Sequence, residues 1–271
     1  MRIDPTVVGR GADATVYACG PDRVAKVFHT HADNPAIDRE AENTRLALAC
    51  GLPVPRIYEV TTWDGQPAII MDRVSGQSLI LALLSGAASV ESVGAEMATL
   101  HFSIHKNRID TGLTSLTDWL EARIRRAPDL RPEEIDRLLA LLAAQETGNR
   151  FCHNDFHPDN ILRTPGGDVV IDWCDATAGN PWADVARTML VFESRALPPD
   201  TPSETGHAMN AAREAVGAAY VARYRTLAGV DELPIQGWRV LVAASRLWLA
   251  LPGETGINRK IVRRFLDGGQ G

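Results

Sequence analysis

His153-Asn-Asp-Phe-His-Pro-Asp-Asn160 is followed, twelve residues beyond Asn160, by Val170-Ile-Asp-Trp173. Asp155 and Asn160 stand five residues apart with a proline between them, and this spacing does not share one face of a helix. A constrained loop is therefore expected to present both side chains. Asp172 comes at the end of an apolar run that predicts a short strand, which can bring its carboxylate to the same place.

These three side chains form the set that phosphoryl transfer requires. A carboxylate must orient the attacking hydroxyl and accept its proton, and oxygen ligands must hold the metal ion that neutralises the phosphates. Asp155 is the candidate for the carboxylate, and Asn160 and Asp172 are the candidates for the metal ligands. The alternative is that all three only make hydrogen bonds within a loop. Their joint spacing and the apolar residues around them favour the catalytic interpretation.

The spacing of residues 153–160, with Ile-Asp-Trp at 171–173 where protein kinases have Asp-Phe-Gly, resembles the aminoglycoside phosphotransferase and choline kinase-like family. The resemblance covers nearly the whole chain. It implies an α+β, protein-kinase-like fold of two lobes, a small antiparallel β-sheet lobe and a larger, mainly helical lobe. It also implies ATP as co-substrate with Mg²⁺, Asp155 as the catalytic carboxylate, and Asn160 and Asp172 on the metal.

The first residues support this resemblance. Gly9-Arg-Gly-Ala-Asp-Ala-Thr-Val16 follows the kinase glycine-loop pattern GxGxxGxV, except that Ala14 replaces the third glycine. Glycine permits a close approach of backbone to phosphate, and alanine is the smallest departure from it. The resemblance therefore makes Gly9 and Gly11 nucleotide-binding candidates, although a glycine-rich hairpin turn has the same pattern.

Lys26 is a lone cation within the apolar strand of residues 24–28, and a helix that carries Glu40 follows. Strand lysines are commonly solvated edge residues. In this position, the resemblance implies that Lys26 holds the α- and β-phosphates of the nucleotide and that Glu40 is its ion-pair partner. Glu42 is a rival for the partner's role.

Ile69-Ile-Met-Asp-Arg-Val-Ser-Gly76 resembles the family's hinge, where backbone groups of Asp72 to Val74 would meet the edge of the adenine. The simpler alternative is the end of a strand. The corresponding division is a nucleotide-binding lobe at 1–72, a hinge at 73–76 and a helical lobe at 77–271, with a ligand cleft between the lobes.

Hydrophobic periodicity predicts the elements along the chain. Strands are expected near 7–8, 15–18, 24–28, 56–61, 68–71 and 169–173. Helices are expected at 34–49, 77–84, 88–105, 115–125, 132–144, 208–227 and 234–250. The acidic, proline-rich segment 197–206 is expected to be an exposed loop.

Two further residues have structural roles by the resemblance. Asp184, in the segment that begins Gly179-Asn-Pro, would brace the catalytic loop by hydrogen bonding, although it could equally cap a helix. His101, at the end of the family's Leu-His helix, is expected to pack rather than react. His157, Asp159 and Asp175 are assigned accessory positions.

Composition excludes several classes of protein. The formal net charge of −6 argues against a broad basic surface, so no nucleic-acid partner is expected. The four cysteines form no CxxC pair, which disfavours a zinc site or a disulfide framework. No signal-peptide core and no long apolar span is present, so no membrane partner is expected and a cytoplasmic location is the economical interpretation.

The predicted function is a small-molecule kinase that phosphorylates a hydroxyl group. A protein kinase is disfavoured because no Ala-Pro-Glu follows residues 171–173. A nucleotide-binding pseudokinase is disfavoured because Lys26, Asp155, Asn160 and Asp172 are all present. ATP and GTP are not distinguished, and neither is the oligomeric state.

The acceptor is expected to be a small hydroxylated molecule, and an aminoglycoside is the leading named candidate by resemblance. Segment 256–267 is basic, which would suit a neutral or anionic acceptor if it borders the cleft. The alternative is a solvated amphipathic helix. Carboxylates from other segments could still line an acidic wall; the candidates are Glu193, Asp200, Glu204, Glu214, Asp231 and Glu232.

Overall fold

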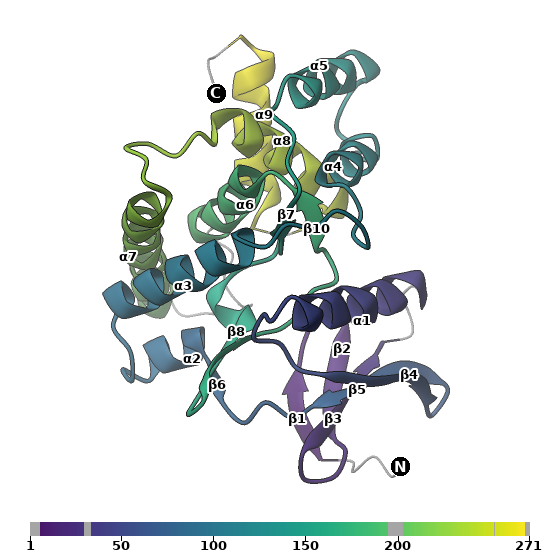
Figure 1. Cartoon of the computed structure of the whole chain (residues 1–271). Coiled ribbons are helices and arrows are strands. Elements are labelled where there is room, and N and C mark those ends of the chain that lie inside the picture. Colours follow the sequence, from purple (N-terminus) through teal and green to yellow (C-terminus); the bar gives the residue numbers. More distant parts are fainter. Residues whose placement is uncertain (1–5, 30–33, 195–202, 252, 269–271) are drawn as a thin grey trace. The chain divides into compact units, whose positions relative to one another are not determined.

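The computed structural model of the chain describes residues 6–29, 34–194, 203–251 and 253–268 (Figure 1). The chain forms two compact units. The first contains residues 1–82 and 158–175, and the second contains residues 83–157 and 176–271. Among the described residues, no helix combines the length and apolar character needed to cross a membrane.

The first unit is built on a five-stranded antiparallel sheet in the order β1-β2-β3-β5-β4. Its elements are β1 (Val7–Arg10), β2 (Ala14–Ala18), β3 (Arg23–Phe28), β4 (Ile57–Trp63), β5 (Gln66–Asp72) and the helix α1 (Asn34–Ala49). The expected strands and the expected helix are therefore present. Helix α1 packs against one face of the sheet (Figure 1).

Alternation along β3 determines what each face of the sheet contacts. Phe28 points to the face that α1 covers, where it packs with Ile37 of the helix and Ile69 of β5. Ala25 and Val27 point to the other face and form a second core. Because side chains alternate along a strand, Lys26 shares the α1 face with Phe28.

A second, three-stranded sheet completes the first unit. It contains β6 (Gln77–Ser78), β8 (Ile161–Thr164) and β9 (Gly167–Val170), in the order β6-β8-β9, and the short helix η1 (Pro158–Asn160) precedes β8. Strand β9 ends at Val170, whereas the sequence predicted a strand over 169–173. The chain turns there because Asp172 has a positive φ of 68°.

The two units differ from the lobes expected from the sequence, which were residues 1–72 and 77–271 with a hinge between them, and the second sheet explains the difference. β6 follows the five-stranded sheet directly and pairs with β8, with Gln77 opposite Arg163. At Gly76 a Cβ atom would lie only 2.1 Å from the carbonyl oxygen of Arg163, so glycine allows the two segments to approach. Residues 158–175, expected in the helical lobe, consequently group with the first unit.

The second unit is mainly helical. It contains α3 (Val90–His105), α4 (Leu116–Ile124), α5 (Pro132–Ala143), α6 (Pro181–Glu193), α7 (Ser203–Ala228), α8 (Gln236–Arg246), η2 (Leu247–Leu249) and α9 (Thr255–Leu266). The antiparallel pair β7 (Arg150–Cys152) and β10 (Thr177–Gly179) lies among them. The remaining helix, α2 (Leu79–Leu84), crosses the boundary between the units.

Two sequence predictions in this unit need correction. Helix α6 was not predicted, although Asn180 caps it and Pro181 occupies its first turn, a common pair of helix-start signals. The loop expected at 197–206 is helical from Ser203 onward, because α7 begins there. Residues 197–202 lie outside the described part of the chain.

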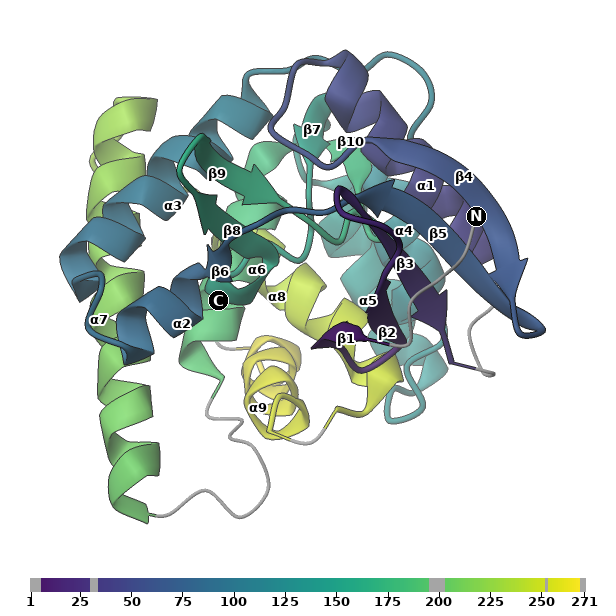
Figure 2. The same ribbon diagram turned by 90° about the horizontal axis from the view of Figure 1, so that it is seen from below.

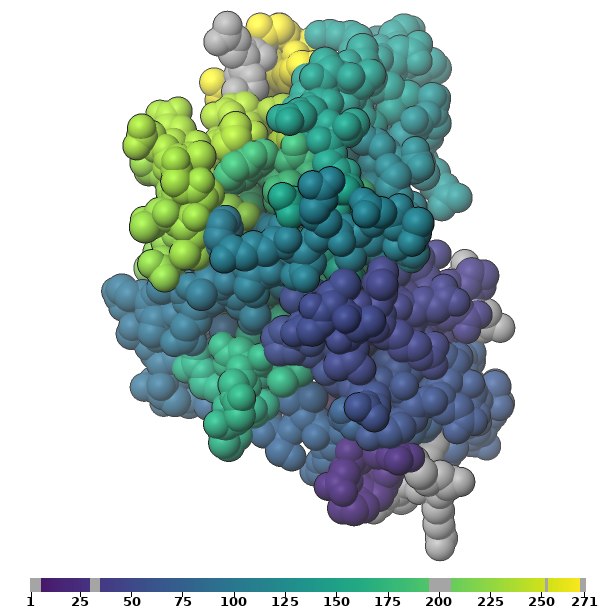
Figure 3. All heavy atoms as spheres, viewed as in Figure 1, coloured from purple at the N-terminus to yellow at the C-terminus, as the bar shows by residue number. Residues whose placement is uncertain are grey.

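Helices α3 and α7 lie side by side (Figures 1 and 2), and their side chains meet in the space-filling view (Figure 3). The helices approach closely at Gly94 of α3. A Cβ atom at this position would lie 2.6 Å from the carbonyl oxygen of Val216 and 2.6 Å from the Cβ of Ala219. A glycine is therefore required where the two helices touch.

Candidate active site

Lys26 forms an ion pair with Glu40. Its Nζ lies 2.6 Å from Glu40 Oε1, and both side chains are largely buried. Glu40 lies one turn beyond Ile37 on the inner face of α1, while Glu42 is exposed. The geometry thus selects Glu40 over Glu42 as the partner. Burial alone would lower the pKa of Lys26, but Glu40 and Asp172 outweigh it and raise the pKa, so the ammonium stays charged at neutral pH.

Asp172 is the second carboxylate near this lysine. Its Oδ1 lies 3.5 Å from Lys26 Nζ, and 40% of its side chain is exposed. The left-handed backbone of Asp172 is unfavourable for a residue with a Cβ, so the neighbouring residues must hold it. Asn43 Nδ2 donates to the carbonyl of Trp173 at 2.9 Å, and Trp173 Nε1 donates to the carbonyl of Val170 at 3.1 Å.

Asn160 is tied to the same turn. The amide of Ile171 donates to the carbonyl oxygen of Asn160 at 3.0 Å, and the Asn160 side chain is buried. The two candidate metal ligands therefore lie at the same end of the β8–β9 hairpin of the first unit, one before β8 and the other after β9. Carboxylate and amide oxygens suit Mg²⁺, which prefers oxygen ligands and binds through one or two carboxylates together with substrate phosphates.

Gly9 and Gly11 lie at the β1-β2 hairpin. Gly9 pairs with Val16, and the amide of Gly11 donates to the carbonyl of Ala14 at 2.9 Å. A Cβ atom at either glycine would make only ordinary contacts, at 3.8 Å and 3.6 Å. The hairpin itself therefore does not require glycine at these two positions.

Asp72 and Val74 follow the sheet. The Asp72 carboxylate is already engaged, because it accepts from the amide of Arg56 at 3.0 Å and from the hydroxyl of Tyr58 at 2.7 Å. The amides of Asp72 and Arg73 donate to the carbonyls of Arg56 and Asp22. Val74 comes next and is half-buried. Any contact of Asp72 with a ligand would thus involve its carbonyl rather than its carboxylate or amide.

In the second unit, Asp184 holds the loop that carries Asp155. The backbone amides of His153 and Asn154 both donate to its carboxylate, the latter at 2.9 Å. Asn154 has a positive φ of 61°, and its side chain donates to Thr177 Oγ1 at 2.8 Å. The expected bracing role of Asp184 is confirmed, and its position in the first turn of α6 is set by Asn180.

Two buried histidines complete the surroundings of Asp184. His101 Nε2 and His105 Nε2 lie 3.0 Å and 3.2 Å from Asp184 Oδ2. Their Nδ1 atoms face the hydroxyls of Tyr220 and Tyr224 at 2.8 Å and 2.6 Å. Burial, the largest cause, lowers the pKa of His101 to about 4. The hydroxyl of Tyr220 can therefore donate to the Nδ1 of a neutral His101. Of the two Nε2 atoms, that of His105 is hydrogen bonded to Asp184, whereas that of His101 lies near the carboxylate without hydrogen-bond geometry.

Three such groups could in principle hold a metal ion, since their ligand atoms lie within 4.8 Å of one another. Asp184 already accepts from two backbone amides, however, and His105 Nε2 is hydrogen bonded to it as well. The cluster is better explained as a hydrogen-bonded brace. His101 also stacks on Phe156 of the loop, with ring centroids 4.1 Å apart, so its expected packing role is confirmed.

Asp155 is held by basic side chains. Arg187 Nη2 lies 3.0 Å from its Oδ1, and His157 Nε2 lies 3.4 Å from its Oδ2. Burial would raise the pKa of Asp155, but His157, Arg187 and Arg246 outweigh it and hold the pKa well below its usual range. The carboxylate is therefore ionised, and 30% of its side chain is exposed.

Sequence reasoning missed the residues behind Asp155. Arg187 and Arg246 are almost fully buried, and Glu254 lies between them, 3.7 Å from Arg187 Nη2 and 3.0 Å from Arg246 Nη2. Arg187 had a local signal, because it follows Asp184 by three residues on one helical face. Arg246 and Glu254 come from α8 and the start of α9, and no local pattern links them to Asp155.

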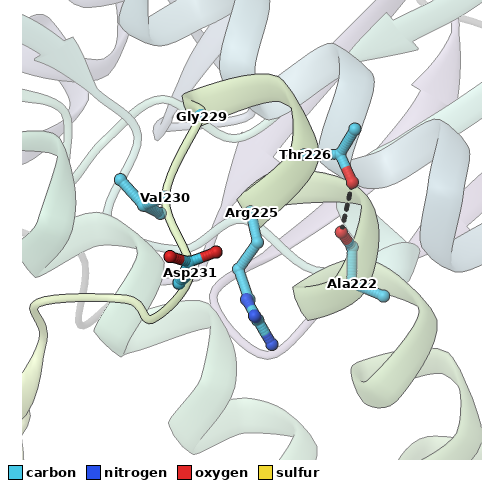
Figure 4. A pocket seen from close by; sticks show the side chains of 6 residues that line it. All are labelled: Ala222, Arg225, Thr226, Gly229, Val230 and Asp231. Atoms are coloured by element: carbon cyan, nitrogen blue, oxygen red, sulfur yellow. Dashed lines mark hydrogen bonds between the residues drawn. The ribbon is translucent and has the colours of Figure 1, made fainter.

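A pocket elsewhere in the second unit has no comparable chemistry. It lies at the end of α7 and is lined by Ala222, Arg225, Thr226, Gly229, Val230 and Asp231 (Figure 4). Arg225 and Asp231 are exposed, and the Thr226 hydroxyl donates to the carbonyl of Ala222 within the helix. The pocket contains none of the predicted site residues.

The chain belongs to the phosphotransferase enzyme family, whose model matches residues 4–233. Its class is therefore that of the small-molecule kinases, and the expected family and enzyme class are confirmed. No curated protein sequence matches the chain.

Solved structures share the fold. An aminoglycoside-3'-phosphotransferase of type VIII matches with 21% identity and a TM-score of 0.63, over 91% of this chain and 93% of that one. A choline kinase from Cryptosporidium parvum matches with 13% identity and a TM-score of 0.56, over 98% and 88%. A streptomycin-ATP ternary complex of the aminoglycoside phosphotransferase APH(2")-IIa matches with 17% identity and a TM-score of 0.51, over 100% and 92%. The predicted α+β, protein-kinase-like fold is confirmed.

Proposed function

We propose that the chain transfers the γ-phosphate of ATP to a hydroxyl group of a small molecule, with Mg²⁺ as cofactor. The observation that carries this proposal is the Lys26–Glu40 ion pair with Asp172 beside it, because it is the phosphate- and metal-binding arrangement that kinase-like phosphoryl transfer requires. GTP is the alternative nucleotide.

The first unit supplies the nucleotide contacts in this proposal. Lys26, kept charged by Glu40, binds the α- and β-phosphates. The backbone at Gly9 and Gly11 covers the phosphates, which accounts for glycines that the hairpin itself does not need. The Asp72 carbonyl and the Val74 amide contact the adenine edge. A similar fold in complex with ATP, at 17% identity, supports a nucleotide site of this kind.

Asn160 and Asp172 hold Mg²⁺ in this proposal. The fit rests on the hydrogen bond that links their two segments at the end of the β8–β9 hairpin and on the partly exposed carboxylate of Asp172 beside Lys26. When bound, the ion neutralises charge on the phosphate oxygens. The left-handed backbone at Asp172 is the kind of local strain that functional sites retain, and it orients the carboxylate before the ligand arrives.

Asp155 acts on the acceptor. Its ionised carboxylate accepts a hydrogen bond from the acceptor hydroxyl and orients the oxygen toward the γ-phosphorus. It receives the proton as the new oxygen–phosphorus bond forms and the bond from the γ-phosphorus to the bridging oxygen breaks, which releases ADP. His157 and Arg187 keep the carboxylate ionised, and Arg187 fixes one of its oxygens. The brace from Asp184 to the backbone of residues 153–154 limits movement of the loop, which favours a correctly positioned base.

A pseudokinase is the competing function. It is disfavoured because Lys26, Asp155, Asn160 and Asp172 are all retained and the Lys26–Glu40 ion pair is formed. The direct test is to incubate the purified chain with MgATP and a panel of hydroxylated metabolites and antibiotics, and to search for phosphorylated product by mass spectrometry. The proposal expects product from at least one alcohol. Tight nucleotide binding without any product would favour the pseudokinase.

A further inference from the structure

The side chains behind Asp155 form a continuous ionic network within the second unit. Asp155 pairs with Arg187, Arg187 lies near Glu254, and Glu254 pairs with Arg246. Arg187 and Arg246 have side chains only 3% and 7% exposed, whereas Glu254 is 18% exposed. Two buried guanidinium groups therefore share the carboxylate of Glu254.

Arg246 contacts Glu254 through a single oxygen. Both its Nε and its Nη2 lie 3.0 Å from Glu254 Oε2. A guanidinium offers five N–H donors in a planar fork that matches the two oxygens of a carboxylate or the oxygens of a phosphate. The guanidinium of Arg246 is thus suited to bind the anionic group of a ligand, and the carboxylate of Glu254 occupies that position in this structure.

Of the six carboxylates considered in the sequence, Asp200 and the side chain of Glu204 lie outside the described part of the chain, and Glu214 is exposed on α7. Among those considered in the sequence, Glu193 is paired with Arg239, and Asp231 and Glu232 are exposed at the end of α7. A cationic acceptor would have to replace the hydration of each ammonium with a carboxylate. Beside Asp155 it would meet Glu254, which both arginines already neutralise.

The basic residues of segment 256–267 do not account for the positive charge near Asp155. In α9, Arg259 pairs with Asp129 and Arg263 pairs with Glu134, while Val262 and Leu266 are buried. Segment 256–267 therefore forms the amphipathic helix that the sequence offered as the alternative to a basic wall beside the cleft. The charge preference near Asp155 therefore comes from Arg187 and Arg246, and not from the basic face of α9.

We propose that the acceptor is an anionic alcohol, whose carboxylate or phosphate binds the Arg246 guanidinium in place of Glu254 while its hydroxyl meets Asp155. This inference rests on the proposed function, because it needs Asp155 to be the group that receives the acceptor. Glu254 then acts as a specificity-determining residue: it neutralises Arg246 in the empty protein and yields its place to the anion of the acceptor.

The test compares sugar derivatives that differ in charge. Gluconate carries a carboxylate, glucose 6-phosphate carries a phosphate, glucose is neutral and glucosamine is cationic; kanamycin serves as a polycation. Phosphorylation of each is followed with the full-length chain and MgATP, and binding of each is measured by calorimetry with a non-hydrolysable ATP analogue. We expect gluconate or glucose 6-phosphate to bind and to be phosphorylated with the highest kcat/KM, and the better of the two identifies the anionic group.

Two substitutions should change KM for the anionic acceptor in opposite directions. Arg246→Met removes the anion-binding group, so KM for the anionic acceptor should rise on the order of tenfold or more. Glu254→Gln removes the competing carboxylate, so KM for the same acceptor should fall several-fold. A simple loss of structure cannot lower KM, which makes the second variant informative even if the first is unstable. Arg264→Met, at an exposed position of α9, is the matched control and should leave KM within about twofold.

The inference is overturned if glucosamine or kanamycin is the preferred acceptor, if Glu254→Gln raises KM, or if none of the five compounds binds in the calorimeter. Its failure is distinct from failure of the proposed function. Efficient phosphorylation of a cationic alcohol would refute the anionic acceptor and leave the kinase assignment intact. Binding of the anionic compounds with no phosphoryl transfer to any alcohol would support the anion site and refute the kinase assignment.

Discussion

Lys26 lies between two carboxylates on the inner face of β3, and this position predicts the effect of replacing it. Lys26→Met should reduce kcat/KM for ATP on the order of a hundredfold or more, because a buried cation that contacts phosphate cannot be replaced by solvent. Glu40→Gln should cause a smaller loss. Steady-state kinetics with varied ATP measures both effects.

Glu42 provides the control for this pair, since it lies on the same helix and is exposed. Glu42→Gln should change kcat/KM by less than about twofold. If Glu42→Gln reduced activity while Glu40→Gln had no effect, the ion pair would have no role in nucleotide use.

The ionisation of Asp155 depends on His157 first and then on Arg187 and Arg246, and the contribution of Arg187 leads to a prediction about pH. The pKa of Asp155 is lowered, so the carboxylate stays ionised, and kcat should persist until the pH falls into the acid range. Arg187→Met removes one of the charges that lower the pKa, so the acid limb of the kcat profile should move to higher pH. Arg239→Met removes an arginine that pairs with Glu193 instead, and its acid limb should stay in place. An unchanged kcat profile in Arg187→Met would mean that Arg187 does not affect the pKa of Asp155.

At the scale of elements, α3 and α7 depend on their close approach at Gly94. Gly94→Ala places a Cβ atom 2.6 Å from the carbonyl of Val216, so the helices must separate and the free energy of unfolding should fall by about 1 to 3 kcal/mol. Gly256→Ala in α9 meets no atom within 4 Å and should instead be neutral or stabilising. Urea unfolding of the two variants measures the contrast.

The brace around Asp184 connects α3, α6 and α7, and it should make stability depend on pH. The pKa of His101 falls from 6.5 to about 4 on folding, so the unfolded chain binds more protons between these values. The free energy of unfolding should therefore be highest above pH 6.5 and decrease as the pH falls toward 4. His101→Gln keeps a neutral donor that does not titrate, and it should flatten this decrease. An equally steep decrease in that variant would mean that other groups cause it.

At the scale of the whole molecule, the sequence predicted those elements and site residues that are specified by residues close to them in the chain. Lys26 and Glu40 were found through the resemblance to the family, which left Glu42 as a rival, and the ion pair in the structure is formed by Glu40. The braces at Asp184 and His101 followed from the resemblance. Helix α6 was missed although its start signals, Asn180 and Pro181, were present in the sequence.

Long-range contacts could not be read in this way. Arg246 and Glu254 reach the neighbourhood of Asp155 through the packing of α8 and the start of α9, which no spacing records. Residues 158–175 group with the first unit because a two-residue strand, β6, pairs with β8. A strand of two residues is too short to show alternation of apolar and polar residues. The sequence therefore could not indicate this pairing.

The central claim is that Asp155 acts on the acceptor while Asp172 acts on the metal and nucleotide, and a comparison of their asparagine variants tests it most directly. Binding of MgATP and single-turnover transfer should be measured on the same preparations of Asp155→Asn and Asp172→Asn. Asp155→Asn is expected to bind MgATP normally and to lose turnover on the order of 10³-fold, whereas Asp172→Asn should also lose metal-dependent nucleotide binding. Near-normal phosphoryl transfer by Asp155→Asn would contradict the account.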